Sequence, residues 1–193
     1  MLKKFEIVLD GPGIILFDPY LLAEFVQQYQ LGDTNLFQQF KQNTQVGDEA
    51  VRQGVILPIY TIPAIEYQIV ISDSSESSVE ADWVRFTTSP FPLTIGNGKL
   101  VVSDIYGIMD WDAEFYKIMA VDVSECPQVA TELESGKYSV VIKGFSERNY
   151  VGRGPKNIGY KFLLQKVEEL PVLQESMNNE SFDFVLYRPG QPG

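Results

Sequence analysis

The chain contains no histidine and a single cysteine, Cys126. Histidine is the side chain that titrates closest to neutral pH, so its absence excludes Ser-His-Asp and Cys-His catalytic arrangements and most transition-metal sites. One cysteine cannot form an internal disulfide, and no Cys/His set is present for zinc, which favours a reducing, cytoplasmic compartment. We therefore expect a protein that is not an enzyme and carries no cofactor or metal.

Long hydrophobic runs are also missing. The most apolar stretch, residues 55–71, is interrupted by two prolines and a glutamate, so it does not predict a membrane span. The segment 1–10 starts like a signal peptide, but Glu6 and Asp10 interrupt its apolar part too early. We interpret it instead as a first strand, and we expect no membrane association.

The chain has few basic residues compared with acidic ones. The 193 residues include 26 Asp and Glu but only 15 Lys and Arg, for a formal net charge of −11. Such a charge disfavours direct nucleic-acid binding, because phosphates are bound by clustered Lys and Arg. Two interpretations of the acidity stay open. It keeps the protein soluble, or it forms a negative surface that meets a basic protein, with a nuclease or toxin among the candidates.

The composition, with 45% hydrophobic and 21% charged residues, predicts a folded globular chain that we expect to be one domain over residues 1–193. Residues 1–54 are predicted to form a strand followed by one or two α-helices. Asp18 precedes a proline and is placed to cap the first helix, and Asp33 is placed to start the second. A helical turn closed by Gly54 ends this part.

From residue 55 to residue 187, β-branched and aromatic runs alternate with Gly, Pro, Asn and Ser, which predicts an antiparallel β-sandwich. In residues 137–143 the side chains alternate clearly between apolar and polar, as expected for a strand with one buried face. The expected strands are 5–9, 55–62, 66–72, 83–88, 93–95, 99–104, 115–123, 137–145, 158–168 and 181–187. The fold class predicted from the sequence is therefore mainly β, with N-terminal helices.

The most concentrated acidic motif is the segment 110–115, DWDAEF. In an extended conformation its three acidic residues would share one face and its apolar residues the other. Three interpretations stay open: a solvated strand edge with Trp111 and Phe115 in the core, a surface for a basic partner, or a calcium or paired-carboxylate site, although the full calcium-loop pattern is missing. The candidate partner-binding residues are Asp104, Tyr106, Asp110, Trp111, Asp112 and Glu114.

Charge is distributed unevenly along the chain. Residues 104–134 contain eight acidic side chains and one lysine, whereas residues 143–166 contain six basic side chains and one glutamate. The basic part includes a Gly-rich loop, residues 148–156, which we interpret either as a long hairpin loop or as an anion-binding loop. We expect a dipolar molecule.

Four short motifs between residues 48 and 167 have a characteristic order and spacing: Asp48-Glu49-Ala50 before Gly54, Pro90-Phe91 before Leu93-Thr94-Ile95, Gly98-Lys99-Leu100-Val101-Val102, and Gly136-Lys137-Tyr138-Ser139-Val140. In these motifs the chain resembles the competence protein J family, compact β-sandwich inhibitors of a DNA-entry nuclease. The resemblance implies a nuclease inhibitor or immunity-type protein whose acidic face occupies a basic, DNA-binding cleft. The N-terminal helices and the insert around Asp110 have no counterpart in it.

The leading hypothesis is thus an acidic protein-binding domain that blocks a basic partner. The alternative is a carbohydrate- or calcium-binding β-sandwich, in which Trp83, Tyr106 and Trp111 would stack on a ligand and Asp110 with Asp112 would coordinate it. A structural subunit of a larger assembly is the third possibility.

Overall fold

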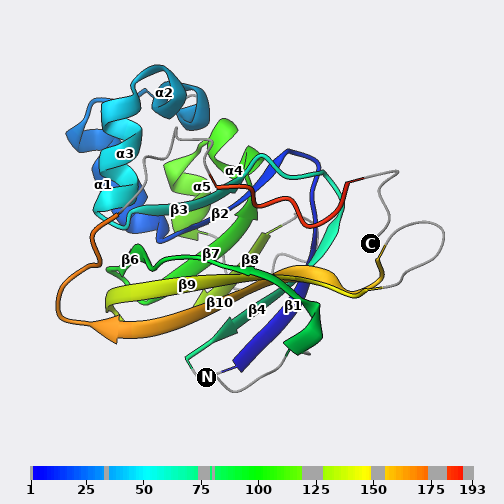
Figure 1. Ribbon diagram of the computed structural model, residues 1–193. Coiled ribbons are helices and arrows are strands. Elements are labelled where there is room, and N and C mark those ends of the chain that lie inside the picture. Colours follow the sequence, from blue (N-terminus) through cyan, green and yellow to red (C-terminus); the bar gives the residue numbers. More distant parts are fainter. Residues whose placement is uncertain are drawn as a thin grey trace.

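The computed structural model describes residues 2–32, 35–73, 79, 81–118, 128–148, 155–173 and 182–188, which form two β-sheets and a layer of helices (Figure 1). Sheet A contains β1 (Leu2–Val8), β4 (Glu66–Ser72), β5 (Val84–Thr87), β6 (Phe91–Ile95), β9 (Gly136–Ser146) and β10 (Ile158–Val167). Sheet B contains β2 (Gly13–Phe17), β3 (Ile56–Tyr60), β7 (Lys99–Asp104) and β8 (Gln128–Glu132). The helices are α1 (Pro19–Gln28), α2 (Leu36–Gln42), α3 (Thr44–Arg52), α4 (Tyr106–Met109), α5 (Ala113–Ile118) and the short 3-10 helix η1 (Ala81–Trp83). The predicted mainly β class is confirmed.

The strands of sheet A pair in the order β1-β4-β10-β9-β5, with β6 also beside β9, and those of sheet B in the order β3-β2-β7-β8. All these pairs are antiparallel except β4 with β10, which are parallel, so the sheets are mainly antiparallel, as predicted, and the parallel pair was not expected from the sequence. Gly159 of β10 lies opposite Gln68 of β4, and a Cβ atom on Gly159 would approach the Gln68 carbonyl oxygen to 1.9 Å. The parallel pair therefore requires glycine at this position.

The two sheets pack face to face over one apolar core, as predicted for a sandwich. Tyr67 of β4 and Tyr160 of β10 are fully buried in this core. Each hydroxyl donates to a carbonyl oxygen, Tyr67 to Pro63 at 3.0 Å and Tyr160 to Phe184 at 2.9 Å. Burial raises the pKa of both phenols. These two buried hydroxyl groups are therefore satisfied by main-chain carbonyl groups, as buried polar groups usually are.

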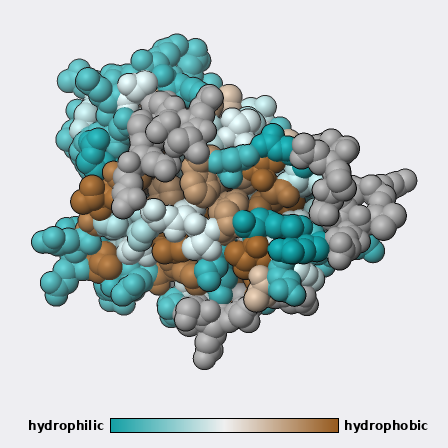
Figure 2. Space-filling model, viewed as in Figure 1, coloured by the Kyte–Doolittle hydropathy of each residue, from teal (hydrophilic) through white to brown (hydrophobic). Residues whose placement is uncertain are grey.

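The opposite face of sheet B is covered by helices, so sheet B is the middle layer. Its residues Ile15, Phe17 and Val101 pack with Phe25 of α1 and Phe40 of α2 in a second apolar core. Strand β2 is consequently buried along its whole length, which explains why its sequence is continuously apolar rather than alternating. The outer sides of α2 and α3 form a hydrophilic surface, whereas apolar residues reach the surface over the sheets (Figure 2).

The helix signals at the N-terminus are partly confirmed. Asp18 caps α1, as predicted, and its carboxylate accepts the N–H groups of Tyr20 and Leu21 at 2.8 and 3.2 Å. Gly54 follows α3 with a φ of +68°, also as predicted. The second helix starts at Leu36 with Asn35 as its cap, while Asp33 lies outside the described residues. The described N-terminal part contains three helices rather than one or two.

Other predictions of strands are wrong. Residues 115–118 of the predicted strand 115–123 belong to helix α5, and the remainder of that strand lies outside the described residues. Residues 182–187 are not a strand, although Phe182 and Phe184 pack on Phe86 of β5. Strand β8 and helix α4 were not expected from the sequence. Cys126 and most of the Gly-rich loop, residues 149–154, lie outside the described residues.

Candidate functional site

The chain leaves sheet B at the end of β7 and enters α4 and α5. At this point, beside the turn that joins β1 to β2, lies an open pocket of about 590 Å³. We call it the acidic pocket, and its lining residues are Asp10, Ser103, Asp104, Tyr106, Gly107, Asp110, Asp112, Phe115 and Tyr116. The fold therefore gathers four of the six predicted site residues, namely Asp104, Tyr106, Asp110 and Asp112, in one pocket.

Asp104 forms the buried wall of the acidic pocket, and its residue is only 1% exposed. Its Oδ2 accepts the N–H groups of Asp10 and Gly11 at 2.6 and 2.8 Å, and its Oδ1 accepts the N–H of Tyr106 at 2.8 Å. Both carboxylate oxygens are thus used to hold the β1–β2 turn against the start of α4. Asp104 positions Asp10 and Tyr106 in the pocket and presents little surface of its own.

Asp112 starts helix α5, because its Oδ1 accepts the N–H groups of Glu114 and Phe115 at 2.9 and 3.1 Å. The extended conformation considered for residues 110–115 is therefore wrong. Asp110 and Asp112 nevertheless both line the acidic pocket and are exposed to solvent. Glu114 lies on α5, is exposed, and does not belong to the pocket lining.

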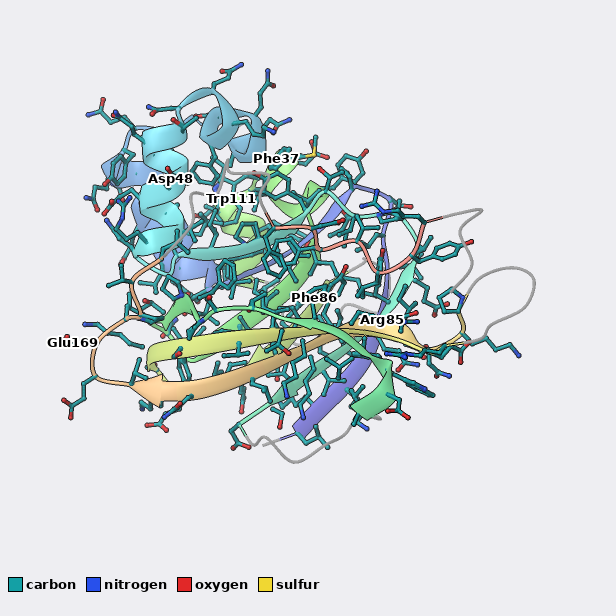
Figure 3. All side chains as sticks on the ribbon, in the orientation of Figure 1. Phe37, Asp48, Arg85, Phe86, Trp111 and Glu169 are labelled. Carbon is teal, nitrogen blue, oxygen red and sulfur yellow. The ribbon has the colours of Figure 1, made fainter. Side chains whose placement is uncertain are left out.

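Trp111 is a core residue, only 3% exposed. Its ring stacks on Tyr116 at a centroid distance of 5.1 Å and an interplanar angle of 15°, and meets the edge of Phe17 at 6.0 Å. Its indole Nε1 is buried and finds no hydrogen-bond partner in the described part of the chain. Figure 3 shows Trp111 beside the N-terminal helices, where it lines a second depression of about 450 Å³ with Tyr20 and Gln27 of α1. Trp111 thus lies in the core, as one interpretation of residues 110–115 expected, and packs against Tyr116 of the acidic pocket rather than lining that pocket itself.

Two aromatic rings at the acidic pocket are open to solvent. Tyr106 is 43% exposed and Phe115 is 42% exposed, unusually high values for large aromatic side chains. Phe115 meets Tyr116 edge-on at 5.2 Å, which fixes its ring at the rim. Carboxylates beside exposed aromatic faces are suited to receive a Lys or Arg side chain, because ion pairing and cation–π attraction then act together.

Five lining residues of the acidic pocket were not among the predicted site residues, and two of them, Asp10 and Phe115, contribute a carboxylate and an exposed ring. Asp10 was noted only because it interrupts the apolar part of residues 1–10, and Phe115 was placed in the core in one of the three interpretations of residues 110–115. Asp10 is separated from Asp104 by 94 positions, so no local pattern could have joined them. Phe115 could have been recognised as exposed only if the helix beginning after Asp112 had been expected.

Basic side chains gather elsewhere, on the outer face of sheet A. The register places Lys143 of β9 directly opposite Lys161 of β10, and Lys4 of β1 in the same row beyond Val70 of β4. Burial, together with Lys143 and Lys4, lowers the pKa of Lys161. In the described part of the chain, the row of lysines thus lies on sheet A, whereas the acidic pocket lies at the end of β7.

Within the described ranges, no three His, Cys, Asp or Glu side chains are grouped so that they could hold a metal ion. No helix in these ranges combines the length and the apolar character needed to cross a bilayer.

Fold and site together define a mainly β domain of two packed sheets with an acidic pocket beside its helical layer. No family model and no curated protein matches the chain. Two solved structures are similar to it. One is ComJ, inhibitor of the DNA degrading activity of NucA, from Bacillus subtilis, with 11% identity, a TM-score of 0.45, and coverage of 86% of this chain and 99% of that chain. The other is described as Crocagin biosynthetic gene J, with 10% identity, a TM-score of 0.42, and coverage of 84% and 97%.

The first of these structures bears the name of the family that residues 48–167 resemble, so the resemblance is confirmed as a weak structural similarity.

Proposed function

We propose that this chain is an acidic protein-binding domain, of the nuclease-inhibitor or immunity type, that blocks a basic partner through the acidic pocket. The observation that carries the proposal is the composition of the pocket rim. It joins three solvent-exposed carboxylates, those of Asp10, Asp110 and Asp112, to the exposed rings of Tyr106 and Phe115. No histidine, cofactor or metal is needed for this role.

Each component of the rim has a distinct effect on binding. Exposed carboxylates, added to the net charge of −11, attract a basic protein over a long range and accelerate its association. Exposed aromatic rings bury apolar area on contact and slow dissociation, which is the usual role of an interface anchor. Carboxylates can also replace the phosphates of DNA in a basic cleft, and this is the mode of inhibition that the competence protein J resemblance implies.

The first test is affinity capture from a lysate of the source cells at low and at high salt, with the bound proteins identified by mass spectrometry. We expect one basic protein that is retained at low salt and released as salt rises, since exposed charges are screened within about 10 Å at 0.1 M salt. The captured protein is then assayed for cleavage of plasmid DNA with and without the added domain. If the captured protein binds the domain but does not cleave DNA, the domain is not a nuclease inhibitor, although its role in binding a basic protein stands.

The pocket itself is tested with Asp110→Lys, compared with Glu169→Lys on the exposed segment after β10 (Figure 3). Both variants change the net charge equally. Asp110→Lys is expected to slow association with the captured protein roughly tenfold at low salt, with little effect from Glu169→Lys. Tyr106→Ser is expected to act mainly on the dissociation rate. Equal effects of the two charge reversals would place the binding surface elsewhere.

A further inference from the structure

Strand β1 forms one edge of sheet A. All seven of its residues pair with β4, from Leu2 opposite Ser72 to Val8 opposite Glu66. Among the described strands, none lies on its other side. An edge strand of this length presents a row of backbone N–H and C=O groups to which another strand can be added.

The side chains of β1 on the outer face of sheet A are Leu2, Lys4, Glu6 and Val8, and all four are exposed. Leu2 is 56% exposed and Val8 is 57% exposed, so both ends of the strand present apolar surface. Edge strands are commonly protected from pairing by lysines, prolines or bulges. Strand β1 carries two lysines, Lys3 and Lys4, but on the outer face Lys4 is balanced by Glu6, and these two residues lie symmetrically between Leu2 and Val8.

This arrangement is complementary to itself when a second copy of the strand runs antiparallel to the first about Phe5. Lys4 then lies opposite Glu6 of the second copy, and Leu2 lies opposite Val8 of the second copy. The two Phe5 residues face each other, and Lys3 lies opposite Ile7 of the second copy. All seven residues overlap, so this register also forms the largest number of backbone hydrogen bonds.

Other registers are disfavoured. A slip by one residue moves every side chain to the wrong face of the sheet. A slip by two residues places Lys4 opposite Lys4 or Glu6 opposite Glu6, and like charges directly opposite each other destabilise a pair of strands. The sequence of β1 therefore specifies one register of self-pairing.

We propose that β1 is the interface of a homodimer, in which sheet A continues from one copy into the other across a two-fold axis at Phe5. Such an interface is isologous, because the same surface is used by both copies. Residues Leu2, Lys4, Glu6 and Val8 line it on the outer face. The proposal does not depend on the function of the acidic pocket.

Sedimentation velocity over a concentration series, at fixed ionic strength, tests the proposal with the full chain. The variants are Lys4→Glu, Glu6→Lys and the double variant, with Lys137→Glu, an exposed change of the same kind on β9, as the control. Each single variant replaces two opposite-charge contacts across the interface by two like-charge contacts. The dimer dissociation constant is therefore expected to rise roughly tenfold or more. The double variant restores both contacts with reversed sign and is expected to dimerise within about threefold of the wild type.

Three outcomes would overturn the proposal: a wild type that stays monomeric at every concentration, single variants that behave like Lys137→Glu, or a double variant no better than the single ones. Hydrogen exchange provides a second measurement on the wild type. Those amides of residues 2–8 that point away from β4 are expected to gain protection as the protein concentration rises, and unchanged protection contradicts the interface.

Discussion

Substitution of Asp104 by asparagine tests whether this residue shapes the acidic pocket, as its contacts indicate, or only adds charge to it. The asparagine has nearly the same shape as the aspartate but offers one acceptor oxygen and one NH₂ group. If its oxygen takes the place of Oδ2, it keeps the N–H groups of Asp10 and Gly11, which lie at 2.6 and 2.8 Å. Its NH₂ group then faces the N–H of Tyr106. Because both groups are donors, the hydrogen bond from Tyr106 is lost.

The magnitude follows from these three hydrogen bonds. A hydrogen bond to a charged group contributes about 1.5–3 kcal/mol, and one such bond is lost while the other two lose the charge of their acceptor. We expect Asp104→Asn to lower the free energy of unfolding by about 3 kcal/mol. In a domain of this size that corresponds to a fall in Tm of about 6–12 °C.

Urea denaturation and thermal melting measure this effect, with Asp110→Asn as the matched control. Asp110 lines the same pocket, loses the same charge on substitution, and its carboxylate accepts no hydrogen bond among the described residues. A change within about 0.5 kcal/mol is therefore expected for the control. If Asp104→Asn were as mild as Asp110→Asn, the carboxylate of Asp104 would not be holding the β1–β2 turn.

Two further predictions concern stability. The carboxylate of Glu147 accepts hydrogen bonds from the N–H of Lys156 at 2.6 Å and from the side-chain amide of Asn157 at 2.9 Å, and these bonds lower its pKa below the ordinary value of 4.5. The ionised Glu147 therefore stabilises the fold above pH 4.5, and this stabilisation is lost as pH falls through the lower pKa of the folded state. We expect Glu147→Gln to show a shallower loss of stability than the wild type in urea titrations below pH 4.5, and parallel curves would contradict this. For Trp111, whose Nε1 has no partner among the described residues, we expect Trp111→Phe to cost about 1 kcal/mol and Trp111→Ala about 4 kcal/mol. A Phe variant as unstable as the Ala variant in the same urea assay would mean that the indole N–H is hydrogen bonded after all.

Local signals in the sequence predicted the elements whose ends are determined by a few neighbouring residues. Asp18 followed by a proline marked the start of α1, and Gly54 marked the end of the helical part, because caps and left-handed residues act over one turn. Strands β4 and β7 were predicted with their observed ends, since alternation or a continuous apolar run bounded by polar residues defines them well.

The errors arose where a short pattern fits two structures, or where the information is not local. The six residues DWDAEF alternate like a strand, yet a carboxylate at Asp112 followed by Ala113 and Glu114 is equally a helix start. Alternation also says nothing about the direction of a neighbouring strand, so the parallel pairing of β4 with β10 could not be predicted. The predicted residues of the acidic pocket all lie between positions 104 and 112, whereas Asp10, which is distant in the sequence, was missed.

The position of β10 in sheet A has a consequence for how the chain reaches its native state. This strand comes late in the sequence but lies between β4 and β9, so it joins β1 and β4 to the part of the sheet formed by β5, β6 and β9. Until residues 158–167 have been synthesised, β4 and β9 have no strand to fill the gap between them. Pairings so distant in sequence close slowly, since a long loop must be ordered before any contact is gained. We therefore expect the nascent protein to depend on chaperones more than its modest size would indicate, because two incomplete strand edges stay exposed until β10 is inserted.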